Sequence, residues 1–394
     1  MMIRRCLAIV LGVTLSTMSS AADMTAEEVA SAVQTGIDAI MNMEEGADAG
    51  EWPYEGVYRV RGNIPLGYRV GGTGICCLAI AMAPGFDDDA DRQAAVTRGV
   101  RFILDARKDS RMTADDYQGG YDVRGWGFTY GALLMLRLQQ MDRLPDGMEE
   151  DVKTGIAFYV DAIQRTAIPQ VGGWNYARRR GKDTVAAPSS FMTCSTLQTL
   201  FLAADLGYDV DDDVIRKAIA FVKTAKAPSG EFVYSGRGSQ RTGGVPGAIG
   251  RMTMAESTLF LAGEATAADV RGSIDAFIVH WEWLEKRRAQ TGTHVAPYGV
   301  APYYFYYAHL AAAQAIECLP EDERPEYRRR MQEALFRTRD DLGTWNDRVF
   351  ERSANYGTAM SILALLTPDV GLVPAWSADA ENVEDATTPS EQDS

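Results

Sequence analysis

A cluster of carboxylates stands near the middle of the chain, where residues 207–222 read GYDVDDDVIRKAIAFV. Asp209, Asp211 and Asp212 form the pattern Asp-x-Asp-Asp, and a carboxyl group in an apolar site can hold a proton and deliver it to an apolar substrate. The same acids can instead begin a helix, because carboxylates there accept hydrogen bonds from free amides and favour the positive helix end. The neighbouring elements decide between these two roles.

The residues that follow the cluster favour a helix start. Apolar side chains return with a helical period at Val214, Ile215, Ala218, Ile219 and Val222. Three other amphipathic segments also begin with acids, and these are FDDDAD at 86–91, PDGMEED at 145–151 and PEDE at 320–323. We therefore predict that residues 209–213 begin a helix, and we look elsewhere for a catalytic acid.

Three other carboxylates are candidate catalytic acids: Glu256, Asp122 and Asp183. Glu256 lies halfway along the apolar segment MTMAESTLF, where an ionised carboxylate costs several kcal/mol unless it is paired. Arg251 is a candidate partner, and a purely structural salt bridge is the alternative role for Glu256. Asp122 and Asp183 lie in segments that lead into apolar helices, where side chains from several segments can meet at one opening.

Aromatic and basic residues lie near the same predicted opening. The candidate ligand-binding residues are Trp174, Tyr176, Arg178 and Tyr304. Aromatic rings stack on sugars or isoprenoids, and a guanidinium holds a carboxylate or phosphate with two parallel hydrogen bonds. The pattern favours an isoprenoid or sugar-like small molecule as partner, although the indole of Trp174 can also simply pack its turn against a helix. No residue pattern calls for a cofactor.

Short turns that combine glycine with an aromatic residue recur along the chain. They are GEWPYEG (50–56), GGYDVRGWGF (119–128), GGWNY (172–176), GEFVYSG (230–236), VAPYGVAPYYF (295–305) and GTWND (343–347). Each precedes an apolar helix rich in small residues, and most of these are followed by an amphipathic helix with acids near its start. The segment MTAEEVASAVQTGIDAIMNM supplies the amphipathic helix that is missing at the end. The pattern predicts an all-α ring of six inner and six outer helices.

Several of these segments, in order, carry a resemblance that covers roughly residues 40 to 367. GGWNYARRRGKDT, SGEFVYSG, APYYFYYAHLAAAQ and GTWNDRVFERSANYGTAMSILAL resemble exported members of the prenyltransferase and squalene-oxidase repeat family. The resemblance implies an (α/α)6 toroid. In that family, cyclases use an Asp-x-Asp-Asp acid, and protein prenyltransferases use a zinc site with Asp-x-Cys and a distant histidine. The chain has no Asp-x-Cys and only three histidines, His280, His294 and His309, so we predict no metal site.

The ends of the chain predict a three-part organisation. Residues 1–22 begin with MMIRR, continue with an apolar core and end with small residues, which is typical of an export signal. Residues 23–368 form the toroid, and residues 369–394 form a disordered acidic tail. We expect a periplasmic or secreted protein with no stable membrane span. The net charge of −15 argues against nucleic acid as a partner.

Three classes of function remain open from the sequence. The first is a toroid that binds or scaffolds through its central cavity, with or without a protein partner. The second is a terpenoid cyclase-like or prenyltransferase enzyme with an atypical acid. The third is a polysaccharide lyase or another carbohydrate-active α/α barrel, in which an arginine neutralises a uronate. The lining of the central cavity is the observation that separates them.

Overall fold

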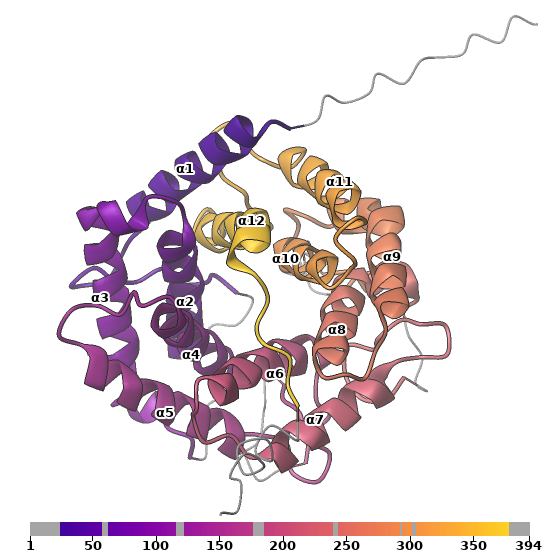
Figure 1. Cartoon of the computed structure of the whole chain (residues 1–394), viewed down its shortest axis with the longest axis horizontal. Coiled ribbons are helices and arrows are strands. Elements are labelled where there is room, and N and C mark those ends of the chain that lie inside the picture. The colour runs from indigo at the N-terminus through magenta and orange to yellow at the C-terminus, as the bar shows by residue number, and fades with distance from the viewer. Residues whose placement is uncertain are drawn as a thin grey trace, which may run out of the picture.

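In the part of the chain that the structure describes, twelve α-helices alternate between an outer and an inner ring (Figure 1). The computed structural model describes residues 24–56, 62–115, 122–175, 185–238, 243–291, 294–301 and 305–377. The outer helices are α1 (Ala26–Asn42), α3 (Ala90–Ala106), α5 (Glu149–Arg165), α7 (Asp212–Ala225), α9 (Ala267–Glu285) and α11 (Arg324–Phe336). The inner helices are α2 (Leu66–Met82), α4 (Arg124–Gln140), α6 (Ser190–Asp205), α8 (Ile249–Leu261), α10 (Phe305–Glu317) and α12 (Ser353–Val370).

The predicted all-α (α/α)6 toroid is confirmed. The described ranges contain no β-strand, only isolated bridges and the short 3-10 helices η1 (Phe86–Asp88), η2 (Ser110–Met112) and η3 (Val245–Gly247). Within the same ranges, no helix combines the length and apolar character needed to cross a membrane. The predicted signal segment 1–22 lies outside the described residues, as do Tyr176, Arg178, Asp183 and Tyr304.

The division into two rings follows from composition. Inner helix α2 buries nearly every residue along its length, because its small and apolar side chains let neighbours approach on all sides. Outer helix α7 buries one face only, through residues such as Ile215, Ile219 and Val222. The ring closes where α1 packs against α12, and a side chain added at Gly36 would come within 2.9 Å of Ile362 Cδ1. Glycine at this position therefore permits the closure.

The carboxylate cluster at 209–213 begins helix α7, as predicted. The side chain of Asp211 is the N-cap and accepts a hydrogen bond of 2.7 Å from the backbone N–H of Asp213. Asp212 occupies the first turn and lies 3.6 Å from the guanidinium of Arg216. These are the contacts of a helix start on the outer ring, distant from the central cavity.

Replacing Asp211 and Asp212 together with asparagine should therefore have a small effect. Asparagine is also a good N-cap, so the change removes mainly the charge interaction with the helix dipole, worth about 0.5–1 kcal/mol. Urea denaturation monitored by circular dichroism measures the loss. A normally folded double variant that lost an activity of the wild-type protein would contradict this assignment and restore these acids as catalysts.

The chain continues in an ordered form beyond the last helix. Residues 371–377, here called the C-terminal strap, run from the end of α12 across one open end of the inner ring (Figure 1). Val373 is buried, the backbone N–H of Trp376 donates to the carbonyl of Leu261 at 2.9 Å, and the Trp376 ring stacks on Phe201. The predicted tail from residue 369 therefore needs a correction at its start, because these apolar side chains find a surface to pack on. Residues 378–394 lie outside the described part.

Candidate functional site

Three of the recurring turns make the same set of contacts. Trp52, Trp174 and Trp345 each donate an indole N–H to a carbonyl near the end of the preceding outer helix, namely to Ile40 at 2.7 Å, Ile163 at 2.8 Å and Leu335 at 3.0 Å. Their backbone N–H groups donate to the hydroxyls of Thr73, Thr193 and Thr358 on the following inner helix. Each turn therefore ties an outer helix to the next inner helix.

Trp174 is thus a structural residue and not part of an exposed ligand site. Only 3% of its surface is exposed, and its single polar atom is occupied by Ile163. The turn brings the aromatic ring under the helices instead of presenting it to solvent. The expectation that Trp174 binds a ligand at the opening does not fit this position.

Asp122 holds the start of helix α4. Its two carboxylate oxygens accept hydrogen bonds from Arg124 at 2.9 and 2.7 Å. The buried Arg124 guanidinium also donates to the backbone carbonyls of Thr113 and Asp115. The pair fastens the segment after α3 to the beginning of α4, so these contacts favour a structural role for Asp122 over the predicted catalytic one.

Glu256 lies on inner helix α8, as predicted, but it faces the outer ring. Its carboxylate lies 2.7 Å from Lys226 Nζ at the end of α7, and Lys226 also contacts Asp269 of α9 at 3.3 Å. Burial raises the pKa of Glu256, and Lys226 opposes that rise. The expected partner Arg251 donates instead to the carbonyl of Phe232 at 3.2 Å. Glu256 is therefore a buried ion-pair residue that does not line the central cavity.

A different carboxylate, Asp347, has the properties expected of a catalytic acid. Its exposed fraction is 0%, and neither carboxylate oxygen has a hydrogen-bond partner. Burial raises the pKa of Asp347 to about 7, although Arg348 and Arg288 oppose the rise. A buried carboxyl without a partner is rare, because its ionisation goes uncompensated. Asp347 is therefore a candidate functional residue.

The sequence carries a signal for Asp347 that is easy to miss. In three other turns a tyrosine follows the aromatic anchor by two residues, as Tyr54 follows Trp52 and Tyr234 follows Phe232. In the last turn Asp347 takes that place after Trp345. A carboxylate thus replaces an aromatic residue at a position where Tyr54 is buried and Tyr234 is half-buried.

The surroundings of Asp347 are mostly aromatic. Its charge contributes to the raised pKa values of Tyr306 and Tyr356, in which burial is the largest cause. The rings of Tyr356 and Tyr54 lie 4.5 Å apart. The neighbouring Arg348 is only 4% exposed, and its Nε and Nη1 atoms have no hydrogen-bond partner. A buried acid, a buried guanidinium and several phenols thus meet near the N-terminal ends of the inner helices.

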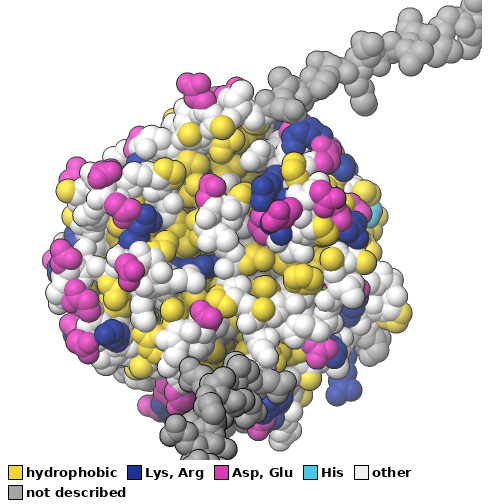
Figure 2. Space-filling view, viewed as in Figure 1, with side chains coloured by type: hydrophobic (Ala, Val, Ile, Leu, Met, Phe, Trp, Pro, Cys, Tyr) yellow, Lys and Arg dark blue, Asp and Glu magenta, His cyan; other side chains and the backbone are white. Residues whose placement is uncertain are grey.

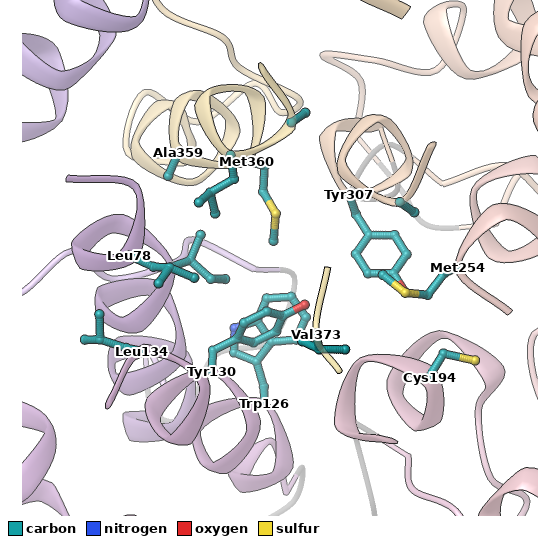
Figure 3. Close-up of a cluster of buried hydrophobic side chains, with 14 of the residues drawn as sticks. Leu78, Trp126, Tyr130, Leu134, Cys194, Met254, Tyr307, Ala359, Met360 and Val373 are labelled. Carbon is teal, nitrogen blue, oxygen red and sulfur yellow. The ribbon is translucent and has the colours of Figure 1, made fainter. Parts of the chain in front are cut away.

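The central cavity occupies the other half of the inner ring. It reaches from the middle of the inner helices to the C-terminal strap, and Figure 3 shows Leu78, Met254, Tyr307, Met360 and Val373 around it. The cavity volume is about 70 Å³, and the surrounding space between atoms, part of which is open to solvent, is about 740 Å³. Its lining contains Arg137 and several amides and hydroxyls but no carboxylate.

The buried histidine is a structural residue. His309 Nε2 accepts a hydrogen bond from the indole of Trp281 at 2.9 Å, and Nδ1 donates to the carbonyl of Phe305 at 2.7 Å. Burial lowers the pKa of His309 to about 4, so the ring is neutral near pH 7. Both nitrogens are occupied, which leaves neither for a metal ion.

Comparisons with known proteins establish the fold. No protein-family model and no curated protein matches the chain. A solved D-mannose isomerase is 12% identical to this chain and has a TM-score of 0.56. The match covers 89% of this chain and 100% of the isomerase chain. A second solved structure is an inactive α-1,6-mannanase variant of Salegentibacter sp. HEL1_6 in complex with α-1,6-mannotriose. It is 12% identical to this chain and has a TM-score of 0.54, and the match covers 86% of this chain and 99% of the mannanase chain.

These likenesses concern architecture and carry no residue assignments. The (α/α)6 toroid of this chain is shared with carbohydrate-active enzymes, and neither of the two named structures is a terpenoid cyclase or a prenyltransferase. The expected resemblance to the prenyltransferase and squalene-oxidase repeats therefore extends to the toroid, and the comparisons add no support for cyclase or prenyltransferase chemistry.

Proposed function

We propose that the protein is an enzyme that transfers a proton on a carbohydrate, with Asp347 as the acid–base group. The observation that carries the proposal is the state of this side chain, which is fully buried, lacks hydrogen-bond partners and has a pKa raised to about 7. Near neutral pH such a group populates both protonation states, which is what a general acid–base catalyst requires. Since Asp347 is unexposed, substrate reaches it only when this end of the ring opens.

The carbohydrate class is supported by the fold and by the neighbours of Asp347. The similar solved structures include a D-mannose isomerase and an α-1,6-mannanase with bound α-1,6-mannotriose. Phenol rings such as Tyr356 can stack on a sugar, and the free N–H groups of Arg348 can donate to its oxygens. A uronate carboxylate would satisfy Arg348 best, because it brings a negative charge to a buried cation.

The presence of one candidate carboxyl favours proton transfer over hydrolysis. Glycoside hydrolysis commonly uses two carboxylates on opposite sides of the bond. Among the described residues Asp347 is the only carboxylate with an exposed fraction of 0%, and Glu51, Asp122 and Glu256 are held in ion pairs. Isomerisation or elimination needs one group that accepts a proton and returns it, which Asp347 can do with a tyrosine as partner.

The terpenoid cyclase alternative receives less support from the central cavity. A cyclase acid must face the bound hydrocarbon, and the described lining of the cavity has no aspartate or glutamate. Export to the periplasm or beyond, which the first 22 residues predict, is compatible with an extracellular sugar as substrate.

Turnover by the Asp347→Asn variant tests the proposal. Wild-type protein is incubated with mannose, α-1,6-mannotriose and a panel of unsaturated and saturated uronate oligosaccharides in D₂O, and exchange, isomerisation or cleavage is followed by NMR. We expect turnover to fall at least 100-fold in Asp347→Asn, because removing a general acid–base typically costs about 10²–10⁴-fold. Equal turnover by a folded Asp347→Asn variant would overturn the assignment.

A further inference from the structure

A second buried charge lies at the opposite end of the inner ring. Arg137, on the last turn of α4, lines the central cavity and is 7% exposed. Its Nη1 donates to Gln140 Oε1 at 2.7 Å, and its Nη2 donates weakly to the carbonyl of Gly371 in the C-terminal strap at 3.4 Å. No carboxylate of the described residues forms an ion pair with it.

The environment of Arg137 does not compensate its charge. Burial lowers the pKa of Arg137 to about 10, and no neighbouring acid contributes to its value. Two other buried arginines differ in this respect, since Arg92 pairs with Asp89 and Arg124 pairs with Asp122. A buried cation costs free energy unless an anion and hydrogen-bond acceptors surround it. Arg137 is therefore positioned to receive an anion from outside the chain.

Two hollows meet at this guanidinium. The first is the central cavity, whose apolar walls include Leu78, Met254 and Met360 (Figure 3). The second is an open groove on the strap side, lined by Asp87, Gln140, Met141, Asp142, Arg143, Asp369 and Leu372, which shares Met82, Arg137 and Val370 with the cavity. Figure 2 shows hydrophobic side chains gathered in the hollows on this face. The groove and the cavity therefore adjoin at Arg137.

We infer that the cavity binds a small monocarboxylate with an apolar chain, whose carboxylate contacts Arg137 and whose chain lies among Leu78, Met254 and Met360. The site is independent of the proposed sugar chemistry, because Asp347 lies at the other end of the inner ring. Apolar walls with one placed charge are the usual form of such a pocket.

A monoanion fits this end better than a phosphate dianion. Arg143, the nearest second cation of the groove, is already engaged by Asp87 at 2.5 Å and by the carbonyl of Ala81 at 2.7 Å. Asp142 and Asp369 also face the groove and would repel a second negative charge. One guanidinium with unused N–H groups matches one carboxylate.

The test uses decanoate with the full chain and isothermal titration calorimetry. Decanol serves as the uncharged probe and acetate as the probe without a chain. We expect decanoate to bind at least tenfold more tightly than either, because only decanoate satisfies both the cation and the apolar walls. Absence of decanoate binding, or equal affinity for decanol, would overturn the inference.

Two variants locate the site. Arg137→Met should weaken decanoate binding at least tenfold and leave decanol binding unchanged. The matched control is Arg92→Met, which removes a buried guanidinium of the outer ring and should leave decanoate binding within twofold of the wild-type value. Unchanged decanoate affinity in Arg137→Met refutes the inference. If Arg137→Met does not fold, the comparison of decanoate with decanol on the wild-type protein decides the question.

Discussion

Asp347→Asn is expected to stabilise the protein at pH 8 by several kcal/mol and to leave its stability near pH 4 almost unchanged. The folded pKa of about 7 lies above the ordinary value of 3.8, so the folded state favours the protonated carboxyl. Stability from this group is therefore full below about pH 4 and is lost as pH rises to about 7. The interval between these pKa values corresponds to about 4 kcal/mol in the free energy of unfolding. Asparagine cannot ionise, so the variant does not lose this stability as pH rises.

Urea denaturation at pH 4, 6 and 8 measures this difference between variant and wild type. Comparison at each pH cancels the contributions of the many other carboxylates. The control is Asp341→Asn, which changes an exposed carboxylate in the same turn and should show no such trend. A constant difference between Asp347→Asn and wild type across this range would show that Asp347 is not buried as an unpaired acid. Higher stability with lower turnover in the same variant would be a stability–activity trade-off.

Trp345→Ala is expected to cost about 3–5 kcal/mol of stability, the usual loss for truncating a fully buried tryptophan. The side chain of Trp345 is 0% exposed, and its indole N–H satisfies the carbonyl of Leu335 at the end of α11. Removal leaves a large cavity between α11 and α12, while the Leu335 carbonyl keeps the hydrogen bonds that it accepts from Thr338. The ring of helices should therefore loosen at this junction.

Trp345→Phe separates packing from hydrogen bonding at the same position. The chain itself carries Phe232 at the corresponding place of another turn, where it is also 0% exposed, so a phenyl ring is compatible with the geometry. We expect a loss of about 1–2 kcal/mol for one buried hydrogen bond and a smaller ring. Trp283→Ala, at a partly exposed tryptophan of α9, is the control and should cost less than Trp345→Ala. Equal losses at Trp283 and Trp345 would contradict the role assigned to the turns.

The helical ring could be predicted because its signals are local. Apolar periodicity, acids at helix starts and glycine–aromatic turns depend on residues a few positions apart. Asp211 illustrates this, since its capping hydrogen bond reaches only to Asp213. The number of helix pairs and their alternation between inner and outer rings followed from the same repeat.

The candidate sites depended on contacts that the repeat does not encode. Glu256 has the sequence context of a cavity acid, yet the rotation of α8 turns it toward Lys226 and the outer ring. Trp174 has the sequence context of a ligand-binding aromatic residue, yet the turn buries its ring, and the indole N–H donates to the carbonyl of Ile163. In both cases the side-chain direction is set by packing between helices, which a single helix pattern cannot specify.

The sequence by itself determined the secondary structure, the order of inner and outer helices and the set of polar residues near the ends of the inner ring. Only the tertiary structure decided which charges are compensated. Asp347 and Arg137 stand out because burial outweighs every compensating contact around them, and that property depends on every element packed against them. The contact between Arg137 and the C-terminal strap joins residues 234 positions apart, a separation over which no local pattern carries information.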